Sequence, residues 1–207
     1  MGDKSKRVTL EGVGCATIIE KKSEFIGYAR PVSSEQEAID YIKAIRKKHA
    51  DARHNVYAYM LGNTTRYSDD GEPQGTAGMP VLDVIRKNGI DGVVIVVTRY
   101  FGGILLGTGG LVRAYTAAAS AAVGEAHIVT YEQYDELSLC CSYSDYPKIE
   151  KALPTFDVIV DGVDFADSVT VRFACLREKT DALTAHLRDL SAGRVAPEII
   201  GERFDKK

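Results

Sequence analysis

The stretch that decides the fold is VVIVVTRYFGGILLGTGGLVRAY, residues 93–115, in which an apolar run leads into a glycine-rich segment. Gly92–Thr98 is apolar on both faces. This predicts a central β-strand that is covered on each side, or covered by helices on one side and by an interface on the other. A helix is expected next, capped by Thr108 and ended by Gly124. Its buried face is predicted to carry Leu111, Tyr115, Ala118, Ala119 and Ala122.

Five glycines lie within the nine residues Gly102–Gly110, between the predicted strand and the predicted helix. One interpretation is mechanical, because glycines let a strand turn sharply into a helix. The other is chemical, because the first N–H groups of a helix and its dipole favour an anion. Arg99 before the segment and Arg113 in the first helical turn are placed to add charge-assisted hydrogen bonds. The segment matches neither the P-loop pattern nor G-x-G-x-x-G, so both interpretations stay open.

The candidate residues for binding an anion or RNA lie in and beside this segment. Arg99 follows five apolar residues and Thr98, so its charge requires a partner or an exit to solvent. Tyr100 and Phe101 could stack on nucleic-acid bases, or could belong to the core at the end of a buried strand. The full candidate set is Arg99, Tyr100, Phe101, Gly102, Gly103, Gly107, Thr108, Gly109, Gly110 and Arg113.

Strands and helices are expected on the N-terminal side of this stretch. Val8–Val32 is predicted to form strands with a turn at Lys21–Ser23. Ser34 and Glu37 have the spacing of a capping box, and the apolar residues that follow them predict a helix over residues 35–49.

The next segments continue this pattern as far as the central strand. His54–Met60 alternates as a strand, and Gly62–Gly78 is predicted to be a long polar loop of a length that is often functional. Pro80 fits the first turn of the following helix, where its missing N–H costs little. Asn88-Gly89 is a natural end for that helix.

Residues with catalytic or metal-binding potential gather in and near this loop. A histidine and carboxylates on separate elements could converge to form a general base or a magnesium site. The alternative is structural, because His54 shares its strand face with apolar residues and Asp-Gly with Glu-Pro is turn chemistry. The structural alternative is favoured, so no catalytic residue, metal site or cofactor is predicted. The secondary loop candidates are His54, Ser68, Asp69, Asp70 and Glu72.

The order of three motifs resembles the IMPACT/YigZ family. They are HNVYAY at 54–59, SDDGEPQGTAGMPVL at 68–82 and VVTRYFGGILLGTGGLVRAY at 96–115, and KKSEFIGYARPV at 21–32 is similar to the family's first hairpin. The resemblance covers nearly all of residues 15–125. It implies a fold like the second domain of ribosomal protein S5, also found in domain IV of the translocation elongation factor. The glycine-rich element would then lie on one exposed face.

The second half has the pattern of a ferredoxin-like domain. A short helix is expected to open near Pro147, a longer one is marked by Leu183–Leu190, and Val195–Phe204 is the expected last strand. The order βαββαβ is ferredoxin-like, and the predicted domains are residues 1–131 and 132–207. Three alternating segments predict the other strands: Leu137–Cys141, Val158–Val160 and Val169–Cys175.

Composition limits the class of protein. A chain of 207 residues that is 45% hydrophobic can bury a core, and its longest apolar run is too short to cross a bilayer. We therefore expect a soluble, cytoplasmic protein with no membrane partner. The four cysteines lack C-x-x-C spacing and are expected to be buried free thiols.

The net charge of −3 argues against coating nucleic acid through charge alone. Up to Gln133 the chain has 16 basic and 15 acidic residues, and from Tyr134 it has 10 and 14. If either half contacts phosphates, it is the first.

The resemblance also implies a function. Bacterial YigZ-type members carry a C-terminal ferredoxin-like domain similar to domain V of the same elongation factor. Eukaryotic members instead have an N-terminal domain that regulates a translation-control kinase, which is not expected in this chain. The first hypothesis is a non-enzymatic, translation-associated protein that binds RNA, the ribosome or a translation regulator through the glycine-rich face. The alternative is an enzyme or sensor acting on a small phosphorylated ligand or nucleotide, because S5-like folds also occur in small-molecule kinases.

Overall fold

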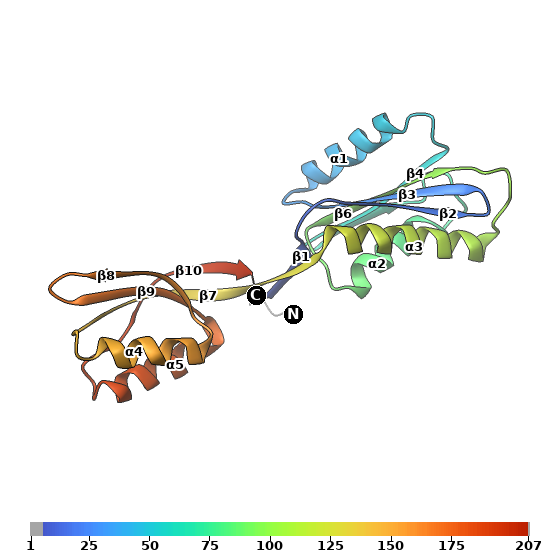
Figure 1. The fold of residues 1–207 in the computed structure, drawn as a ribbon. Coiled ribbons are helices and arrows are strands. Elements are labelled where there is room, and N and C mark those ends of the chain that lie inside the picture. The colour runs from blue at the N-terminus through green and yellow to red at the C-terminus, as the bar shows by residue number, and fades with distance from the viewer. Residues whose placement is uncertain (1–5, 207) are drawn as a thin grey trace. The chain divides into compact units, whose positions relative to one another are not determined.

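The computed structural model describes residues 6–206 as an α+β chain of two compact units (Figure 1). The N-terminal unit is Arg7–Thr130, and the C-terminal unit contains Lys6 and residues 131–206. Each unit has its own hydrophobic core. The two-domain α+β class predicted from the sequence is therefore confirmed.

The first part of the chain forms a five-stranded sheet with three helices. The sheet has the order β2-β3-β6-β4-β5, and all neighbouring strands are antiparallel. The elements are β1 (Lys6–Leu10), β2 (Gly14–Glu20), β3 (Ser23–Pro31), α1 (Glu35–Lys48), β4 (His54–Leu61), β5 (Thr64–Ser68), α2 (Gly78–Lys87), β6 (Val93–Tyr100) and α3 (Thr108–Ala126).

Strand β6 is the centre of this sheet, as its apolar sequence predicts. Because successive side chains of a strand point to opposite faces, Ile95 and Val97 pack with α2 and α3, and Val94 and Val96 pack under α1. The ribbon shows α1 on one face and the other two helices on the opposite face (Figure 1). Each of these fully buried side chains contributes about 1.5–3 kcal/mol to folding.

The capping prediction for α1 is confirmed with one difference. Ser34 is the N-cap, and its Oγ accepts a hydrogen bond from the Glu37 N–H at 3.2 Å. The Glu37 carboxylate, however, accepts from the N–H and Oγ of Ser33 instead of the N–H of Ser34. The helix ends at Lys48, and His49 is its C-cap.

Three expectations about local structure are wrong. Gly62–Gly78 is not one long loop, because β5 (Thr64–Ser68) pairs with β4 across a two-residue turn in which Gly62 has a φ of 56°. The N-cap of α3 is Gly107 instead of Thr108. Helix α3 continues past Gly124 to Ala126, because the buried Val123 and Ala126 keep its last turn on the core.

The C-terminal unit has the predicted ferredoxin-like βαββαβ order. Its four own strands lie in the order β10-β7-β9-β8 with antiparallel neighbours, and β1 is hydrogen-bonded beside β7. Helices α4 and α5 pack on one face of the sheet. The elements are β7 (Ile128–Cys141), α4 (Tyr146–Ala152), the 3-10 helix η1 (Leu153–Phe156), β8 (Ile159–Phe165), β9 (Val169–Leu176), α5 (Arg177–Leu190) and β10 (Glu198–Lys206).

Two further expectations concern the burial of the cysteines and the length of apolar helices. All four cysteines are free, but only Cys141 and Cys175 are buried. Cys15 is exposed on the edge strand β2, and Cys140 on the face of β7 opposite to the one that carries Cys141, so the expectation of four buried thiols is wrong for these two. Between residues 6 and 206, no helix combines the length and apolar character needed to span a membrane.

Candidate functional site

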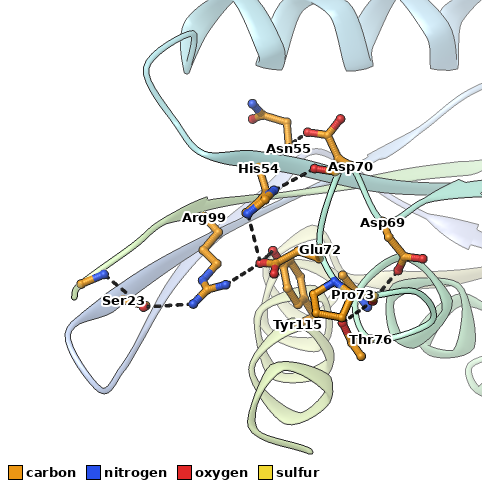
Figure 2. A network of polar contacts seen from close by, with 12 residues as sticks. Ser23, His54, Asn55, Asp69, Asp70, Glu72, Pro73, Thr76, Arg99 and Tyr115 are labelled. Atoms are coloured by element: carbon orange, nitrogen blue, oxygen red, sulfur yellow. Dashed lines mark hydrogen bonds and ion pairs between the residues drawn. The ribbon is translucent and has the colours of Figure 1, made fainter. Parts of the chain in front are cut away.

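The candidate site lies where β6 ends and α3 begins. His54, the first residue of β4, is paired with Arg99 near the end of β6 in the antiparallel register. The loop that follows β5 brings Glu72 to the same place, although it is 27 residues from Arg99 in sequence. Three segments that are distant in sequence therefore meet at this end of the sheet (Figure 2).

Glu72 is the centre of a buried polar network. Arg99 Nη1 donates to Glu72 Oε1 at 2.6 Å, and the Tyr115 hydroxyl donates to the same oxygen at 2.8 Å (Figure 2). Arg99 is 5% exposed and Glu72 is 9% exposed. Removing either charge would leave the other buried without a counter-charge, which is strongly destabilising. The expectation that Arg99 requires a partner is met by this carboxylate.

Tyr115 is held as a hydrogen-bond donor. Burial and the adjacent Glu72 carboxylate raise the pKa of Tyr115 far above its usual value, so the hydroxyl keeps its proton. Its ring packs edge-on against Phe25, with the ring centroids 5.1 Å apart. The sequence predicts Tyr115 only as a core residue, because nothing in the periodicity indicates where the hydroxyl points.

His54 has a fixed tautomer. Its Nδ1 lies 2.7 Å from the main-chain oxygen of Asp70, and because a carbonyl only accepts, Nδ1 carries a proton. In the neutral imidazole Nε2 is therefore the acceptor. Nε2 lies 3.8 Å from Glu72 Oε1, which is too long for a hydrogen bond (Figure 2).

The two aspartates of the loop have structural roles. Asp69 accepts hydrogen bonds from the N–H groups of Gly75, Ala77 and Gly78, and so caps the start of α2 from a distance. Asp70 has a φ of 47°, accepts from the N–H of Asn55, and forms an ion pair with Arg46 at 2.6 Å. Ser68 Oγ in turn accepts from the Asp70 N–H.

Among residues 6–206, no group of three or more histidine, cysteine, aspartate or glutamate side chains is placed to hold a metal ion.

The glycines of the glycine-rich segment differ in what the fold requires of them. A Cβ on Gly102 would lie 2.0 Å from the main-chain carbon and oxygen of Lys22, so this position needs close approach. Gly103 and Gly107 have φ values of 85° and 74°, in the region that favours glycine. These three glycines support the mechanical interpretation.

Gly109 is different. It lies in the first turn of α3 with an ordinary helical backbone, and a Cβ there would meet no atom within 4 Å. Neither packing nor backbone conformation explains a glycine at this position, and glycine is a poor helix former. The chemical interpretation remains open for this residue.

A cleft of about 530 Å³ lies between this segment and the loop after β5. Its polar lining consists of Arg53, His54, Glu72 and Arg99. Its apolar lining consists of Pro73, Phe101, Leu105, Leu106 and Leu111. Gly71, Gly107 and Thr108 complete it, so the start of α3 borders the cleft. Of these residues, Arg53, Gly71, Pro73 and the leucines are not among the candidates. Basic residues at the end of a helix equally complement its dipole, and apolar loop residues give no specific signal.

Six of the ten candidates for binding an anion or RNA do not line this cleft: Tyr100, Gly102, Gly103, Gly109, Gly110 and Arg113. The Tyr100 hydroxyl contacts His49 Nδ1 at 2.9 Å and Asp51 at 3.1 Å, because Tyr100 points to the face of the sheet that α1 covers. Arg113 is exposed on α3 and borders a separate, smaller cleft with Glu20.

The geometry defines a class of protein: a two-unit α+β chain whose N-terminal unit carries the cleft at the end of its central strand. Residues 21–123 match the Impact N-terminal domain, and residues 139–194 match a domain of unknown function, DUF1949. The chain belongs to the IMPACT family. This confirms the resemblance predicted from the three motifs.

The relatives support this membership over nearly the whole chain. The chain is 34% identical to IMPACT family member YvyE of Bacillus subtilis over 189 residues, which cover 90% of this chain and 87% of the relative. It is 35% identical to IMPACT family member YigZ of Escherichia coli over 184 residues, which cover 86% and 90%.

One relative shares only part of the chain, and one solved structure shares almost all of it. Protein IMPACT of Rattus norvegicus is 33% identical over 102 residues, which cover 44% of this chain and 31% of that protein. A crystal structure described as a hypothetical protein has a TM-score of 0.60 and 31% identity, and the match covers 96% of this chain and 99% of that one.

Proposed function

We propose that this chain is a non-enzymatic, translation-associated protein that binds RNA, including RNA on the ribosome, through the glycine-rich segment and the start of α3. Membership of the IMPACT family supports a role related to translation regulation in general. The structure supplies the chemistry that favours RNA at this face.

The observation that carries the proposal is the start of α3. Its N-cap is Gly107, which has no side chain to cap the first N–H groups, and the dipole of a 19-residue helix favours an anion there. Gly109 leaves the main chain of this turn open to a ligand although no internal contact requires a glycine. A phosphate placed here would accept hydrogen bonds from main-chain N–H groups.

The surroundings suit a nucleic acid more than an isolated anion. Arg53 is exposed, and its guanidinium lies 5.7 Å from the ring centroid of Phe101, which is 40% exposed. An exposed arginine beside an aromatic ring is a common arrangement for binding single-stranded nucleic acid. Arg99 does not provide a free charge, because Glu72 neutralises it. Arg113 is an exposed cation of α3, but it borders the separate, smaller cleft.

A second candidate function is favoured by the shape of the cleft. Its volume of about 530 Å³ and its buried polar floor would suit a small phosphorylated ligand or nucleotide, bound by an enzyme or sensor. Thermal shift with nucleotides and sugar phosphates tests this candidate, because a ligand that binds the folded state raises the melting temperature. A rise that disappears in Arg53→Ala, with no RNA or ribosome binding, would replace the first function with the second.

Co-sedimentation with ribosomes and binding to single-stranded RNA at graded salt test the proposal. Binding should weaken as salt rises, and Arg53→Ala should reduce the slope of log K against log salt by about 0.7 for a lost phosphate contact. Arg86→Ala is the matched control. Arg86 is a half-exposed arginine near the end of α2, and the chain runs from there to the start of β6, whereas the proposed face lies at the end of β6. Equal slopes for the two variants would contradict the proposed face.

Gly109→Ala gives a sharper test of the same face. Alanine should raise the free energy of unfolding by about 0.5 kcal/mol, because it is the better helix former. If the proposal is right, the same substitution weakens RNA binding, since the new methyl group lies where the phosphate would approach. If Gly109→Ala is more stable but binds RNA as tightly as the unaltered chain, the start of α3 is not part of the site.

A further inference from the structure

We infer that the cleft binds one nucleotide unit of a single-stranded RNA, and that His54 Nε2 forms a hydrogen bond with the ribose 2′-hydroxyl. This inference rests on the proposed function and specifies the ligand of the same site. It would make the N-terminal unit selective for RNA over DNA.

The first step is the unused hydrogen-bonding capacity of His54. Its Nδ1 is engaged with the Asp70 oxygen at 2.7 Å, whereas Nε2 is 3.8 Å from the nearest carboxylate oxygen, on Glu72. That oxygen already accepts from Arg99 and Tyr115. Since His54 lines the cleft, a bound ligand can supply the missing partner of Nε2.

The second step is the chemical nature of that partner. A neutral Nε2 needs a donor, and a protonated Nε2 needs an acceptor. A hydroxyl group meets both needs, because it can donate and accept. A phosphate oxygen meets only the second. The floor of the cleft therefore suits a hydroxyl better than an anion.

The third step is the set of unlike groups that line the cleft. Gly107 and Thr108 at the start of α3 favour a phosphate. Phe101, Leu105 and Leu106 provide an apolar wall, and Leu105 is 82% exposed, so its side chain is available to a planar ligand. A phosphate, a hydroxyl and a planar apolar group are together the parts of one ribonucleotide.

The buried Arg99 adds to the cost of the arrangement beside the cleft. Among the residues that the structure describes, its Nε is one of the few buried side-chain nitrogen or oxygen atoms without a hydrogen-bond partner. Such groups are uncommon in folded proteins and are costly unless something else satisfies them. Arg99 lines the same cleft as His54.

The experiment compares oligouridylates of equal length that differ at the 2′ position: ribose, deoxyribose and 2′-fluoro. The 2′-fluoro form keeps the sugar shape of RNA but lacks the hydroxyl donor. The full chain should bind the ribose form between about twofold and about tenfold more tightly than the other two, which is the range expected for one hydrogen bond. His54→Ala should bind all three equally.

Two variants separate the role of Nε2 from a loss of structure. His54→Gln also loses the hydrogen bond to the Asp70 oxygen, but its amide can reach the position of Nε2, so it should keep the ribose preference. His186→Ala is the matched control, because His186 is an exposed histidine of α5 in the C-terminal unit. It should behave like the unaltered chain.

The outcomes distinguish the inference from the proposed function. If the chain binds RNA and ribosomes but shows no ribose preference, or keeps that preference in His54→Ala, the inference is wrong and the proposed function stands. If none of the oligonucleotides and no ribosomes bind at low salt, both are wrong. A ribose preference that His54→Ala abolishes and His54→Gln retains supports both.

Discussion

Both units bury carboxylates that are paired with arginines, but the pairs Glu72–Arg99 and Asp135–Arg177 differ in where the arginine lies. In the N-terminal unit Glu72 and Arg99 are both buried, with side-chain exposures of 4% and 6%. In the C-terminal unit Asp135 is buried, whereas the side chain of its partner Arg177 is 41% exposed and also contacts Glu202. A buried carboxylate alone therefore does not mark a functional site.

The surroundings of the two carboxylates explain the difference. Asp135 accepts from Arg177 and Thr180, which both lie in the first turn of α5, so it fastens one helix to the sheet. Glu72 instead joins a loop to β6 and α3 at the wall of a cleft. Burying both charges of the Glu72–Arg99 pair costs free energy, and packing alone does not explain why the N-terminal unit keeps the pair. A binding site at this place would explain it.

The largest test of this comparison is to remove each carboxylate. Glu72→Ala should lower the stability of the N-terminal unit by about 3–5 kcal/mol, because Arg99 would stay buried without a counter-charge. Asp135→Ala should cost the C-terminal unit less than half of that, since Arg177 can turn to water and to Glu202. Hydrogen exchange of the β6 and β9 amides measures the two units separately. Equal losses would contradict the comparison.

Glycine substitutions compare the two units in the same way, with a smaller effect. Gly102→Ala should destabilise the N-terminal unit by about 2–3 kcal/mol, because the new Cβ would overlap the main chain of Lys22. Gly162→Ala in β8 should change stability by no more than about 0.5 kcal/mol, since its nearest neighbour would be Arg172 Nη2 at 3.9 Å. Urea unfolding followed by circular dichroism distinguishes the two, and a neutral Gly102→Ala would argue against the close approach.

Tyrosine hydroxyls provide a finer comparison. Tyr115→Phe should cost about 1.5 kcal/mol, because it removes one donor to the buried Glu72 carboxylate and leaves the ring against Phe25. Tyr143→Phe in the C-terminal unit should cost less than about 0.5 kcal/mol, as Tyr143 is 55% exposed and water can replace its contact with Ala166. The same hydrogen-exchange measurement applies, and a silent Tyr115→Phe would show that Arg99 alone satisfies Glu72.

The smallest expected effect is a difference in pH dependence. Burial of the ring, and to a smaller extent the charge of Lys48, lower the pKa of His49 below its usual 6.5. The N-terminal unit should therefore lose stability as pH falls from 6.5 towards the lower pKa of His49 in the folded state. The hydrogen bonds from Arg194 lower the pKa of Asp145 below its usual 3.8, so its contribution to the C-terminal unit should persist until pH falls below 3.8.

Urea midpoints of each unit, followed by amide NMR signals between about pH 7 and about pH 5, measure this difference. His49→Gln should flatten the dependence of the N-terminal unit. A C-terminal unit that weakens in parallel over this interval would contradict the assignment.

The fold could largely be predicted from the sequence because apolar periodicity reports burial directly. Gly92–Thr98 could hardly be anything except a central strand, and the expected buried face of α3 is the one observed. Strand β5 was missed because it is polar, lies at the edge of the sheet and is not buried at any residue. The ends of α3 were misplaced because Gly107 caps the helix with a positive φ and because the buried Ala126 keeps the last turn on the core.

The candidate site could be predicted only in part, for a related reason. The sequence indicates that Arg99 needs a partner, but it does not indicate which of several acidic residues folds back to it. Glu72 is among the loop candidates as a potential catalytic or metal-binding group, and its pairing with Arg99 depends on how the loop after β5 folds back onto the end of β6. The free Nε2 of His54 likewise depends on the hydrogen bond to Asp70, which no local pattern predicts.

The three N–H groups held by Asp69 have a consequence for how the N-terminal unit opens. Because one carboxylate secures both Gly75 and the beginning of α2, the loop cannot detach without also releasing the amides of Ala77 and Gly78. The loop and the first turn of that helix should therefore behave as one cooperative segment, in which a single local opening exposes all three amides together.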